Sequence, residues 1–331
     1  MRKVLFVLLT ACLLFVSSAL FASVSEIKLR LAHVVNEKDI FHVAAVKFKE
    51  LVEERTNGRV QIDIYPNAVL GDERTLLEGM QLGTIDMGVI TNGPVANFLP
   101  EIAVFELPFL FANAQEAYAV LDGPVGKDLL KSLEKVNLKG LAYAERGFRN
   151  ITNSKRPVRT PADLKGLKIR VMENPVYIDT FKALGANVIP MAWTEALTAL
   201  QQGTIDGQEN PIVVIHSFKL YETQKYLSLT RHTYAPALII MSLKVFKSLP
   251  SDIQKIFEEC AQQAAEYARK VNGENEERLL KELIDFGMQV TQPDLNAFRE
   301  AVKSVYDKYS ARFGKYLKEI QKQLEELRSN K

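Results

Sequence analysis

The sequence predicts an α/β protein of two similar lobes, each a mostly parallel sheet flanked by helices, with a helical C-terminal layer. Strand and helix patterns alternate along most of the chain, which is typical of parallel sheets. The four letters GTID occur twice, at 83–86 and 203–206, each time between a helix pattern and a strand pattern. A chain of 331 residues is also long enough for two domains.

The first part of the chain predicts strands and helices in alternation. Apolar residues alternate along 27–33 and 59–66, which predicts strands with one buried face. Between them, residues 38–56 carry apolar side chains at helical spacing. Asp72 is expected to cap the next helix, which Gly83 ends before the chain returns to the sheet.

The same order restarts near Leu141. Residues 159–166 predict a compact helix, with a threonine cap, a proline in the first turn and a glycine after the end. Residues 167–172 follow as a strand that has an aliphatic stripe on one side. Thr194 is expected to cap the next helix, and Gly203 to end it.

The repeated GTID has a physical interpretation. Glycine supplies the left-handed residue that closes a helix, and threonine and isoleucine then begin a strand. Two copies in similar surroundings indicate two lobes built alike. Chance, or shared helix-ending chemistry alone, would also produce four matching letters.

The C-terminal part changes character. Ser251 is expected to cap a long helix that runs toward Phe286, with Gly273 as the expected position of a break. Residues 288–291 predict a short strand, and the pattern is helical again from Pro293. Charged residues separate the apolar ones, so this part is expected to form an amphipathic layer rather than a domain of its own.

The predicted lobes are not separated by a low-complexity linker, so strands or helices are expected to cross between them. We assign 24–146 and about 236–275 to lobe I. We assign 147–235 and about 276–331 to lobe II, with a ligand cleft between the lobes.

The N-terminal segment predicts export. Residues 1–22 combine a basic start, an apolar run and small residues near the end, as in a secretory signal peptide, so the protein is expected to be periplasmic. An uncleaved membrane anchor is the alternative, because 4–22 is nearly long enough to span a bilayer. Cys12 stands in a lipoprotein-like LTAC, but the long apolar continuation disfavours lipidation. Cys260 would then have no cysteine partner within the mature chain.

The charge balance argues against a nucleic-acid partner. The chain has 42 Lys and Arg against 40 Asp and Glu, and two of the positive residues, Arg2 and Lys3, lie in the predicted signal peptide. The remainder is neutral, whereas nucleic-acid binding relies on a basic surface.

Catalytic, metal and cofactor motifs are missing from the sequence. The four histidines show no metal-ligand spacing, and the sequence has no HExxH, no GxSxG and no strand followed by GxGxxG. The GPVGKD at 123–128 lacks the spacing and the Ser or Thr of a P-loop. Asp206 and Glu209 could be drawn as a hydrolytic carboxylate pair, but acids three residues apart are common by chance. We therefore predict a protein that is not an enzyme, with no cofactor and no metal.

A few polar and aromatic residues remain as candidates for binding, because ligands of open parallel sheets bind at the strand ends. Arg170 lies near the end of a predicted strand, away from its aliphatic stripe, and Arg149 lies where another strand is expected to pass into a loop. Asn210 precedes a proline, and Trp193 is the only tryptophan. Each also has a purely structural interpretation: ion-paired or solvated arginines, a turn asparagine and a core tryptophan.

Taken together, these residues lie in segments that resemble, in order, the DctP-type solute-binding proteins of TRAP (tripartite ATP-independent periplasmic) transporters. The segments are LAHVV, YPNAVLGDERTLLEGMQLGTIDM, FELPFLF, GFRNITNSKRPVRTPADLKGLKIRVM, GANVIPMAWTEALTALQQGTIDGQENP and KYLSLTRHTY. The resemblance spans about 26–310 and is most specific over 147–211. It implies a two-lobed periplasmic binding protein that closes on an organic acid and delivers it to the integral membrane subunits of the transporter.

The resemblance also implies roles for individual residues. Arg170, in KIRV, would form a two-pronged salt bridge with the ligand carboxylate, and Arg149, in GFRN, would help to hold the acid. Asn210, in GQENP, would hydrogen-bond the ligand. Trp193 would pack beside the ligand, at a position where relatives often have phenylalanine.

From the first lobe, His33 and Glu73 match segments that reach the cleft in the family. The roles of the two arginines agree with their chemistry, because a planar guanidinium offers parallel donors that match the two oxygens of a carboxylate. Two arginines do not decide between a monocarboxylate and a dicarboxylate, and keto, hydroxy and aromatic acids all stay open.

Two other classes of function are considered. An exported α/β enzyme acting on organic acids would need a nucleophile, a metal site or a pair of catalytic bases, and the sequence shows no motif for any of these. A sensor domain or a receptor for an ABC-type importer fits the motif order less well. The chain is expected to be a monomer, with a homodimer through the C-terminal helices as the alternative.

Overall fold

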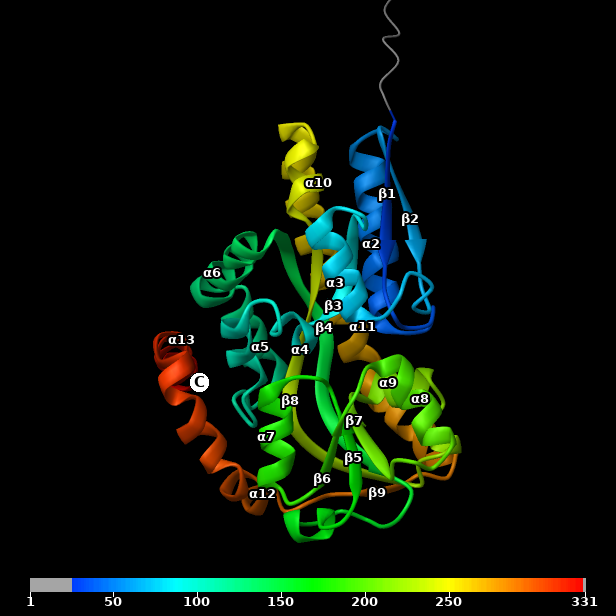
Figure 1. The fold of residues 1–331 in the computed structure, drawn as a ribbon, viewed down its shortest axis with the longest axis vertical. Coiled ribbons are helices and arrows are strands. Elements are labelled where there is room, and N and C mark those ends of the chain that lie inside the picture. Colours follow the sequence, from blue (N-terminus) through cyan, green and yellow to red (C-terminus); the bar gives the residue numbers. More distant parts are fainter. Residues whose placement is uncertain (1–25, 330–331) are drawn as a thin grey trace, which may run out of the picture.

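The computed structural model describes residues 26–329 and confirms the predicted mixed α/β fold (Figure 1). One nine-stranded sheet runs through the molecule, with helices packed around it. The predicted signal peptide and Cys12 lie outside the described residues. Within 26–329, no helix is long and apolar enough to cross a bilayer.

The strands are, in chain order, β1 (Ile27–Ala32), β2 (Val60–Tyr65), β3 (Met87–Thr91), β4 (Leu138–Asn153), β5 (Lys168–Val171), β6 (Asn187–Pro190), β7 (Gly207–Asn210), β8 (Tyr226–Ser242) and β9 (Gln289–Thr291).

The α-helices are α2 (Ile40–Arg55), α3 (Glu73–Leu82), α4 (Asn92–Val95), α5 (Ala114–Leu121), α6 (Pro124–Ser132), α7 (Pro175–Ala183), α8 (Trp193–Gln201), α9 (Ile212–Ser217), α10 (Leu243–Ser248), α11 (Ser251–Asp285), α12 (Leu295–Ala301) and α13 (Lys303–Ser329). Short 3₁₀ helices are η1 (Pro100–Glu106), η2 (Leu133–Val136), η3 (Pro161–Leu164) and η4 (Leu220–Glu222).

The sheet consists of two parallel halves joined by two long antiparallel strands. Its order is β2-β1-β3-β8-β4-β7-β5-β6, and β9 also pairs with β8. The first half is β2-β1-β3, in which β1 pairs in parallel with both neighbours. The second half is β7-β5-β6, in which β5 does the same. In Figure 1, β4 and β8 run along the molecule between these halves.

The two joining strands lose their regular pairing midway, in a stretch that we call the crossing region (145–151 of β4 and 228–234 of β8). The register of β4 on β8 shifts between Glu145 and Gly147 and again between Arg149 and Ile151. In β8, Arg231 has a left-handed φ of 43°, and its N–H donates to the side-chain oxygen of Asn150 at 3.1 Å. An irregular, twisted pair of strands is a natural place for two halves of a molecule to bend. The assignment of residues to lobes stays a prediction.

The two GTID copies adopt the same local structure in the two halves. Gly83 and Gly203 lie just after α3 and α8, with left-handed φ values of 77° and 67°. The next residue in each copy, Thr84 or Thr204, turns its N–H and its hydroxyl back to a carbonyl of the preceding helix. Both copies therefore end a helix in the same way and direct the chain into the sheet.

The aspartate of each copy ties the turn to a neighbouring strand. Asp86 Oδ2 accepts the N–H of Arg30 in β1 at 2.8 Å, and Asp206 Oδ2 accepts the N–H of Lys168 in β5 at 2.9 Å. The two GTID copies therefore share more than the way in which they end a helix, because each aspartate also bonds the backbone of a neighbouring strand. This similarity supports two halves built alike.

Three predictions about helix ends and continuity were wrong. α11 is continuous through Gly273, because it packs against α2, β4 and α9, and such support outweighs a cost of about 1 kcal/mol for an internal glycine. Its N-cap is Pro250 rather than Ser251. α8 begins at Trp193, one residue before the expected cap, and its N-cap is Ala192 rather than Thr194.

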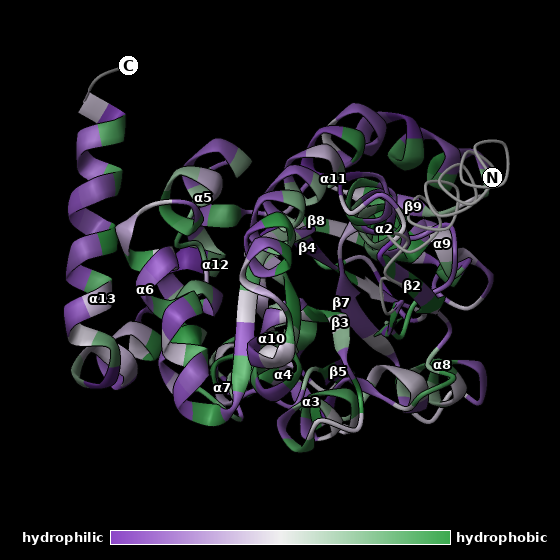
Figure 2. Ribbon diagram, turned by 90° about the horizontal axis from the view of Figure 1, so that it is seen from above, coloured by the Kyte–Doolittle hydropathy of each residue, from purple (hydrophilic) through white to green (hydrophobic). Residues whose placement is uncertain are grey.

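The predicted compact helix at 159–166 and the C-terminal layer are confirmed. The former is η3, with a capping box between Thr160 and Asp163. α13 packs against α5, α6, α7 and η1, and in Figure 2 it lies along one side of the molecule, with a ribbon that is mostly purple because most of its residues are hydrophilic. Its inward side chains are buried: Val305, Tyr309, Phe313, Leu317, Ile320 and Leu324.

Candidate functional site

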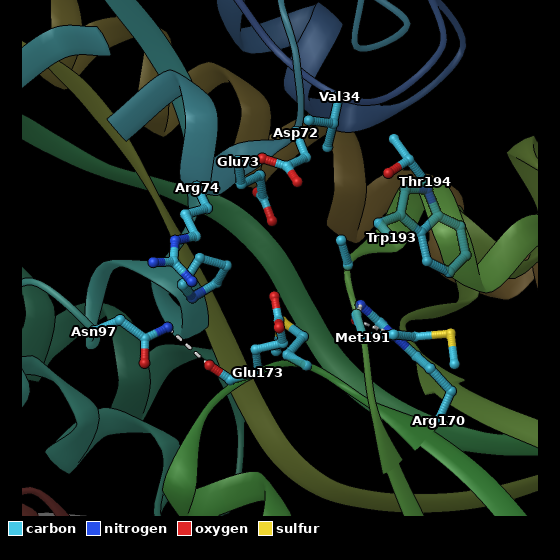
Figure 3. Close-up of a pocket in the computed structure, with 13 residues that line it drawn as sticks. Val34, Asp72, Glu73, Arg74, Asn97, Arg170, Glu173, Met191, Trp193 and Thr194 are labelled. Carbon is cyan, nitrogen blue, oxygen red and sulfur yellow. Dashed lines mark hydrogen bonds between the residues drawn. The ribbon is translucent and has the colours of Figure 1, made fainter. Parts of the chain in front are cut away.

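A cleft lies between the two halves of the sheet, next to the carboxyl ends of the parallel strands (Figure 3). It contains about 730 Å³ of space free of protein atoms, its open mouth included. Residues of both halves line it. The first half contributes Val34, Asp72, Glu73, Arg74, Pro94 and Asn97, and the second half contributes Arg170, Met172, Glu173, Met191, Ala192, Trp193 and Thr194.

Arg170 is the buried cation of this cleft. It lies on β5, and its guanidinium donates from Nε and Nη2 to the carbonyl oxygen of Met191, at 3.0 and 2.7 Å. These two bonds fix the plane of the group, and its centre lies 5.6 Å from the Trp193 ring. Burial lowers the pKa of Arg170 to about 10, so the side chain stays charged at neutral pH.

The pairing of Arg170 differs from that of the other buried arginines. Four arginines are buried within 26–329, and Arg170 is the one among them that forms no ion pair. The partners of the others are Asp39 for Arg146, Glu209 for Arg149 and Asp122 for Arg269. A buried charge without a counter-ion is costly. The cleft therefore contains a buried positive charge that a bound anion would neutralise.

Glu73 lies across the cleft from Arg170 (Figure 3). It is the first residue of α3, which Asp72 caps by accepting the N–H of Thr75 at 2.8 Å. Glu73 Oε1 accepts the N–H of Thr91 at 2.6 Å, and burial raises the pKa of the carboxyl. With Asp72 and Glu173 nearby, this end of the cleft is rich in hydrogen-bond acceptors.

Trp193 forms part of the cleft wall and is also part of the core. The side chain packs edge-on against Phe218, with ring centroids 5.1 Å apart and an interplanar angle of 86°. Trp193 therefore both lines the cleft and packs in the core, and its contact with a ligand stays a prediction. Its position at the start of α8 places it beside Arg170.

The structure brings three of the six predicted site residues to the cleft: Arg170, Trp193 and Glu73. His33 is fully buried instead, with Nε2 3.1 Å from Nδ1 of His42. Burial lowers the pKa of His33 to about 3, so it is neutral at physiological pH. The neighbouring Val34 lines the cleft in its place.

Arg149 and Asn210 are buried and are not among the residues that line the cleft. Arg149 is inside the long strand β4, not at a strand-to-loop transition, and it is bound to Glu209 at 2.5 and 2.8 Å. Glu209 also lies 3.1 Å from Nε2 of His232. Asn210 Nδ2 donates to Gln208 Oε1 at 2.5 Å. In this structure neither Arg149 nor Asn210 lines the cleft.

Several buried polar residues near the cleft were missed by the sequence analysis. Arg146 pairs with Asp39 at 2.8 Å and lies over the Phe41 ring, with the guanidinium carbon 4.3 Å from its centroid. Asn174 links α7 to α4, and Glu106 accepts a bond from α7 as well. The only sequence signal for Arg146 was its place in the same ERGFRN segment as Arg149.

The molecule has two parallel half-sheets joined by two long strands, and a cleft with a buried cation lies between them. This arrangement defines a two-lobed solute-binding protein. Residues 31–312 match the sequence model of the DctP family, described as bacterial extracellular solute-binding protein, family 7. The chain belongs to this family.

Three similar proteins are named for, or were solved with, an organic acid. The 2,3-diketo-L-gulonate-binding periplasmic protein YiaO of Escherichia coli (strain K12) is 40% identical over 303 residues, 91% of this chain and 92% of YiaO. A TRAP periplasmic solute-binding protein from Polaromonas sp. JS666, bound to D-erythronate, has a TM-score of 0.88 and 42% identity, over 89% of this chain and 98% of that chain. The sugar-acid-binding protein DctPAm from Advenella mimigardefordensis, in complex with galactonate, has a TM-score of 0.88 and 35% identity, over 91% and 99%.

Proposed function

We propose that this chain is the extracytoplasmic receptor of a TRAP transporter and binds a small hydroxylated monocarboxylic acid in the cleft. The observation that carries the proposal is the buried Arg170 guanidinium, which faces the cleft without an acidic partner. Membership of a solute-binding family supports it.

The free donors of Arg170 suit a carboxylate. Nε and one hydrogen of Nη2 are used by Met191, which leaves Nη1 and the second hydrogen of Nη2. These donors form the end of the guanidinium fork and match the two oxygens of one carboxylate. Lysine could offer only a point charge at this position.

The opposite end of the cleft suits hydroxyl groups. Asp72, Glu73 and Glu173 present carboxylates, and hydroxyls donate to such acceptors. A second ligand carboxylate would meet these like charges instead. Arg74, the other cleft cation, lies at the exposed rim and is paired with Glu78 at 2.9 Å. We therefore favour a polyhydroxy monocarboxylate over a dicarboxylate, in agreement with the D-erythronate and galactonate bound by the two similar structures.

Binding would proceed by closure of the two lobes about the crossing region. A ligand that bonds Arg170 on one side and Glu73 on the other stabilises the closed form, and so shifts the equilibrium toward it. The closed receptor would then deliver the acid to the integral membrane subunits. Export by the predicted signal peptide at residues 1–22 would place the receptor in the periplasm, and no turnover of the acid is expected.

The proposal is tested by identifying the bound acid. Mass spectrometry of small molecules released from the purified, denatured protein is expected to show a hydroxylated monocarboxylate. A thermal-shift panel should include aldonates, uronates, dicarboxylates and keto acids, and we expect the largest stabilisation from hydroxylated monocarboxylates. No stabilisation by any acid would contradict the receptor function. Conversion of the acid to a product on prolonged incubation would favour an enzyme.

A further inference from the structure

Beside the cleft, the two halves of the molecule are bonded directly to each other. Asn174 Nδ2 donates to the carbonyl oxygen of Gly93 at 3.0 Å, and the Asn174 side chain is fully buried. Asn97 Nδ2 donates to the carbonyl oxygen of Glu173 at 2.7 Å, as Figure 3 shows. We call these two bonds the interlobe junction. They connect the segment after β3 in the first half with the segment after β5 in the second.

We propose that Asn174 is a positioning residue that sets the ligand affinity of this receptor by holding the two lobes together without touching the ligand. The inference rests on the proposed function, because it takes lobe closure to be the step that captures the acid. Asn174 follows Arg170 by four residues, and the intervening Met172 and Glu173 line the cleft. The segment that carries the anion-binding arginine is therefore the segment that bonds the opposite lobe.

The two ends of the Asn174 side chain serve different purposes. Oδ1 caps α7 by accepting the N–H of Val176 at 2.8 Å, while Nδ2 reaches Gly93. Aspartate is as good a cap as asparagine and is favoured by the helix dipole. A cap alone would therefore not require an amide. The donor function of Asn174 is needed only for the bond to the other lobe.

The two segments around the Asn174–Gly93 bond are closely packed, and a second polar contact joins the same two parts of the molecule. A Cβ added at Gly93 would lie 2.9 Å from Cε of Met172, so the two segments are in close contact. Farther in, the hydroxyl of Tyr177 on α7 donates to Glu106 of η1 at 2.5 Å. The Asn174–Gly93 bond of the junction is thus packed and buried, whereas the Asn97–Glu173 bond is exposed. Loss of a buried hydrogen bond costs more than loss of one at the surface.

In this proposal the Asn174–Gly93 bond breaks when the lobes open, so it acts on affinity through the population of the closed state. The apparent dissociation constant is the intrinsic one divided by the fraction of binding-competent protein. Loss of one buried hydrogen bond is expected to reduce that fraction roughly two- to tenfold. Because Asn174 is not among the residues that line the cleft, the factor should be the same for different ligands.

The test compares Asn174→Asp with Asn113→Asp in the full-length mature protein. Both residues are asparagine N-caps, since Asn113 accepts the N–H of Glu116 at 3.0 Å at the start of α5, within the first half. Aspartate preserves both caps, but only Asn174→Asp removes an interlobe donor. It also places a buried carboxylate oxygen against the carbonyl oxygen of Gly93, so the loss of affinity should be at least that expected for one lost hydrogen bond. Dissociation constants and off-rates for D-erythronate and galactonate are measured by calorimetry and stopped flow.

A second readout does not depend on any ligand. Spin labels at cysteines introduced for Lys247 and Gln202, which are exposed on opposite halves, report the distance between the lobes. The native Cys260 is fully buried and should not compete for the label. Asn174→Asp is expected to shift the ligand-free distance distribution toward longer distances, whereas Asn113→Asp should leave it as in the wild type.

The outcomes separate this inference from the proposed function. Weaker binding by one common factor for both acids, a faster off-rate and a longer interlobe distance support the inference. Unchanged affinity and distance in Asn174→Asp, or a loss of thermal stability with unchanged affinity, would overturn it. If the wild type binds neither acid, the receptor function is in question, and the distance distribution alone decides whether the junction holds the lobes together.

Discussion

Arg149, in the crossing region of β4, and Glu209, in β7 of the second half, form a doubly bonded ion pair. Nε of Arg149 lies 2.5 Å from Oε2 of Glu209, and Nη2 lies 2.8 Å from Oε1, while Nη2 also donates to the Glu209 carbonyl oxygen. Both side chains are enclosed. The pair joins β4 to β7, and β7 is the sheet neighbour of β5, the strand that carries Arg170.

The first prediction concerns this ion pair. Arg149→Ala leaves the buried Glu209 carboxylate without its counter-ion, so we expect the free energy of unfolding to fall by about 3–5 kcal/mol. Urea denaturation followed by circular dichroism measures the change. Arg278→Ala is the matched control, because it removes an exposed pair with Glu282 on α11 and should cost less than about 0.5 kcal/mol. Equal losses in both variants would contradict the assignment of a structural role to Arg149.

Arg149 and Arg170 differ in a way that the sequence does not predict. Both arginines were predicted at strand ends, and their residue type alone could not separate them. What separates them is the partner: Glu209 is 60 residues from Arg149 in sequence and becomes its neighbour only through the pairing of β4 with β7. A partner fixed by sheet topology has no local sequence signal.

The second prediction concerns Arg170→Lys. Lysine keeps a positive charge but loses the planar fork, so the ligand carboxylate would lose one of its two bonds. We expect binding of the acid to weaken by about 10- to 100-fold, as for one charge-assisted hydrogen bond. Calorimetry measures the affinity, and circular dichroism checks the fold. Arg74→Lys is the control at the exposed rim of the same cleft and should change the affinity little. Similar affinity losses in both variants would argue against a specific role for Arg170.

The third prediction concerns Glu73→Gln and tests the choice between hydroxylated acids and dicarboxylates. The substitution keeps the size of the side chain and removes its charge. We expect weaker binding of a hydroxylated monocarboxylate such as D-erythronate, because glutamine is the poorer acceptor for hydroxyl groups. Binding of a dicarboxylate of similar length should improve, because its second carboxylate no longer faces Glu73. A parallel loss for both ligands would contradict the proposed orientation of the ligand.

Local sequence signals predicted both ends of α3, although they missed the caps of α8 and α11. Asp72 caps α3 and Gly83 closes it, as expected, because both effects involve only a few neighbouring residues. His33, by contrast, was placed in the cleft, whereas its ring is turned inward toward His42. The direction in which a side chain leaves a strand end depends on the packing of α2 above it, which no short motif records.

The fourth prediction concerns Glu145, a buried carboxylate in the crossing region. Oε2 accepts hydrogen bonds from the hydroxyls of Tyr118 at 2.7 Å and Tyr234 at 3.0 Å. Asn272 and Arg269 of α11 and the carboxylate of Glu276 also face this group. Burial nevertheless outweighs these partners and raises the pKa of Glu145 from 4.5 to about 7.

A raised pKa of a carboxyl group means that ionisation opposes folding. Below pH 4.5 the group is protonated in both states and carries no penalty. As the pH rises toward 7, the unfolded state ionises first and the folded state loses stability relative to it, by roughly 3 kcal/mol once the pH exceeds 7. Glu145→Gln is neutral throughout, so the variant should gain stability relative to the wild type by about that amount between pH 4.5 and pH 8. Urea titrations at several pH values give the difference, and the half-exposed Glu276→Gln serves as the control. A stability difference that does not change with pH would show that Glu145 is already charged, and accommodated, in the folded protein.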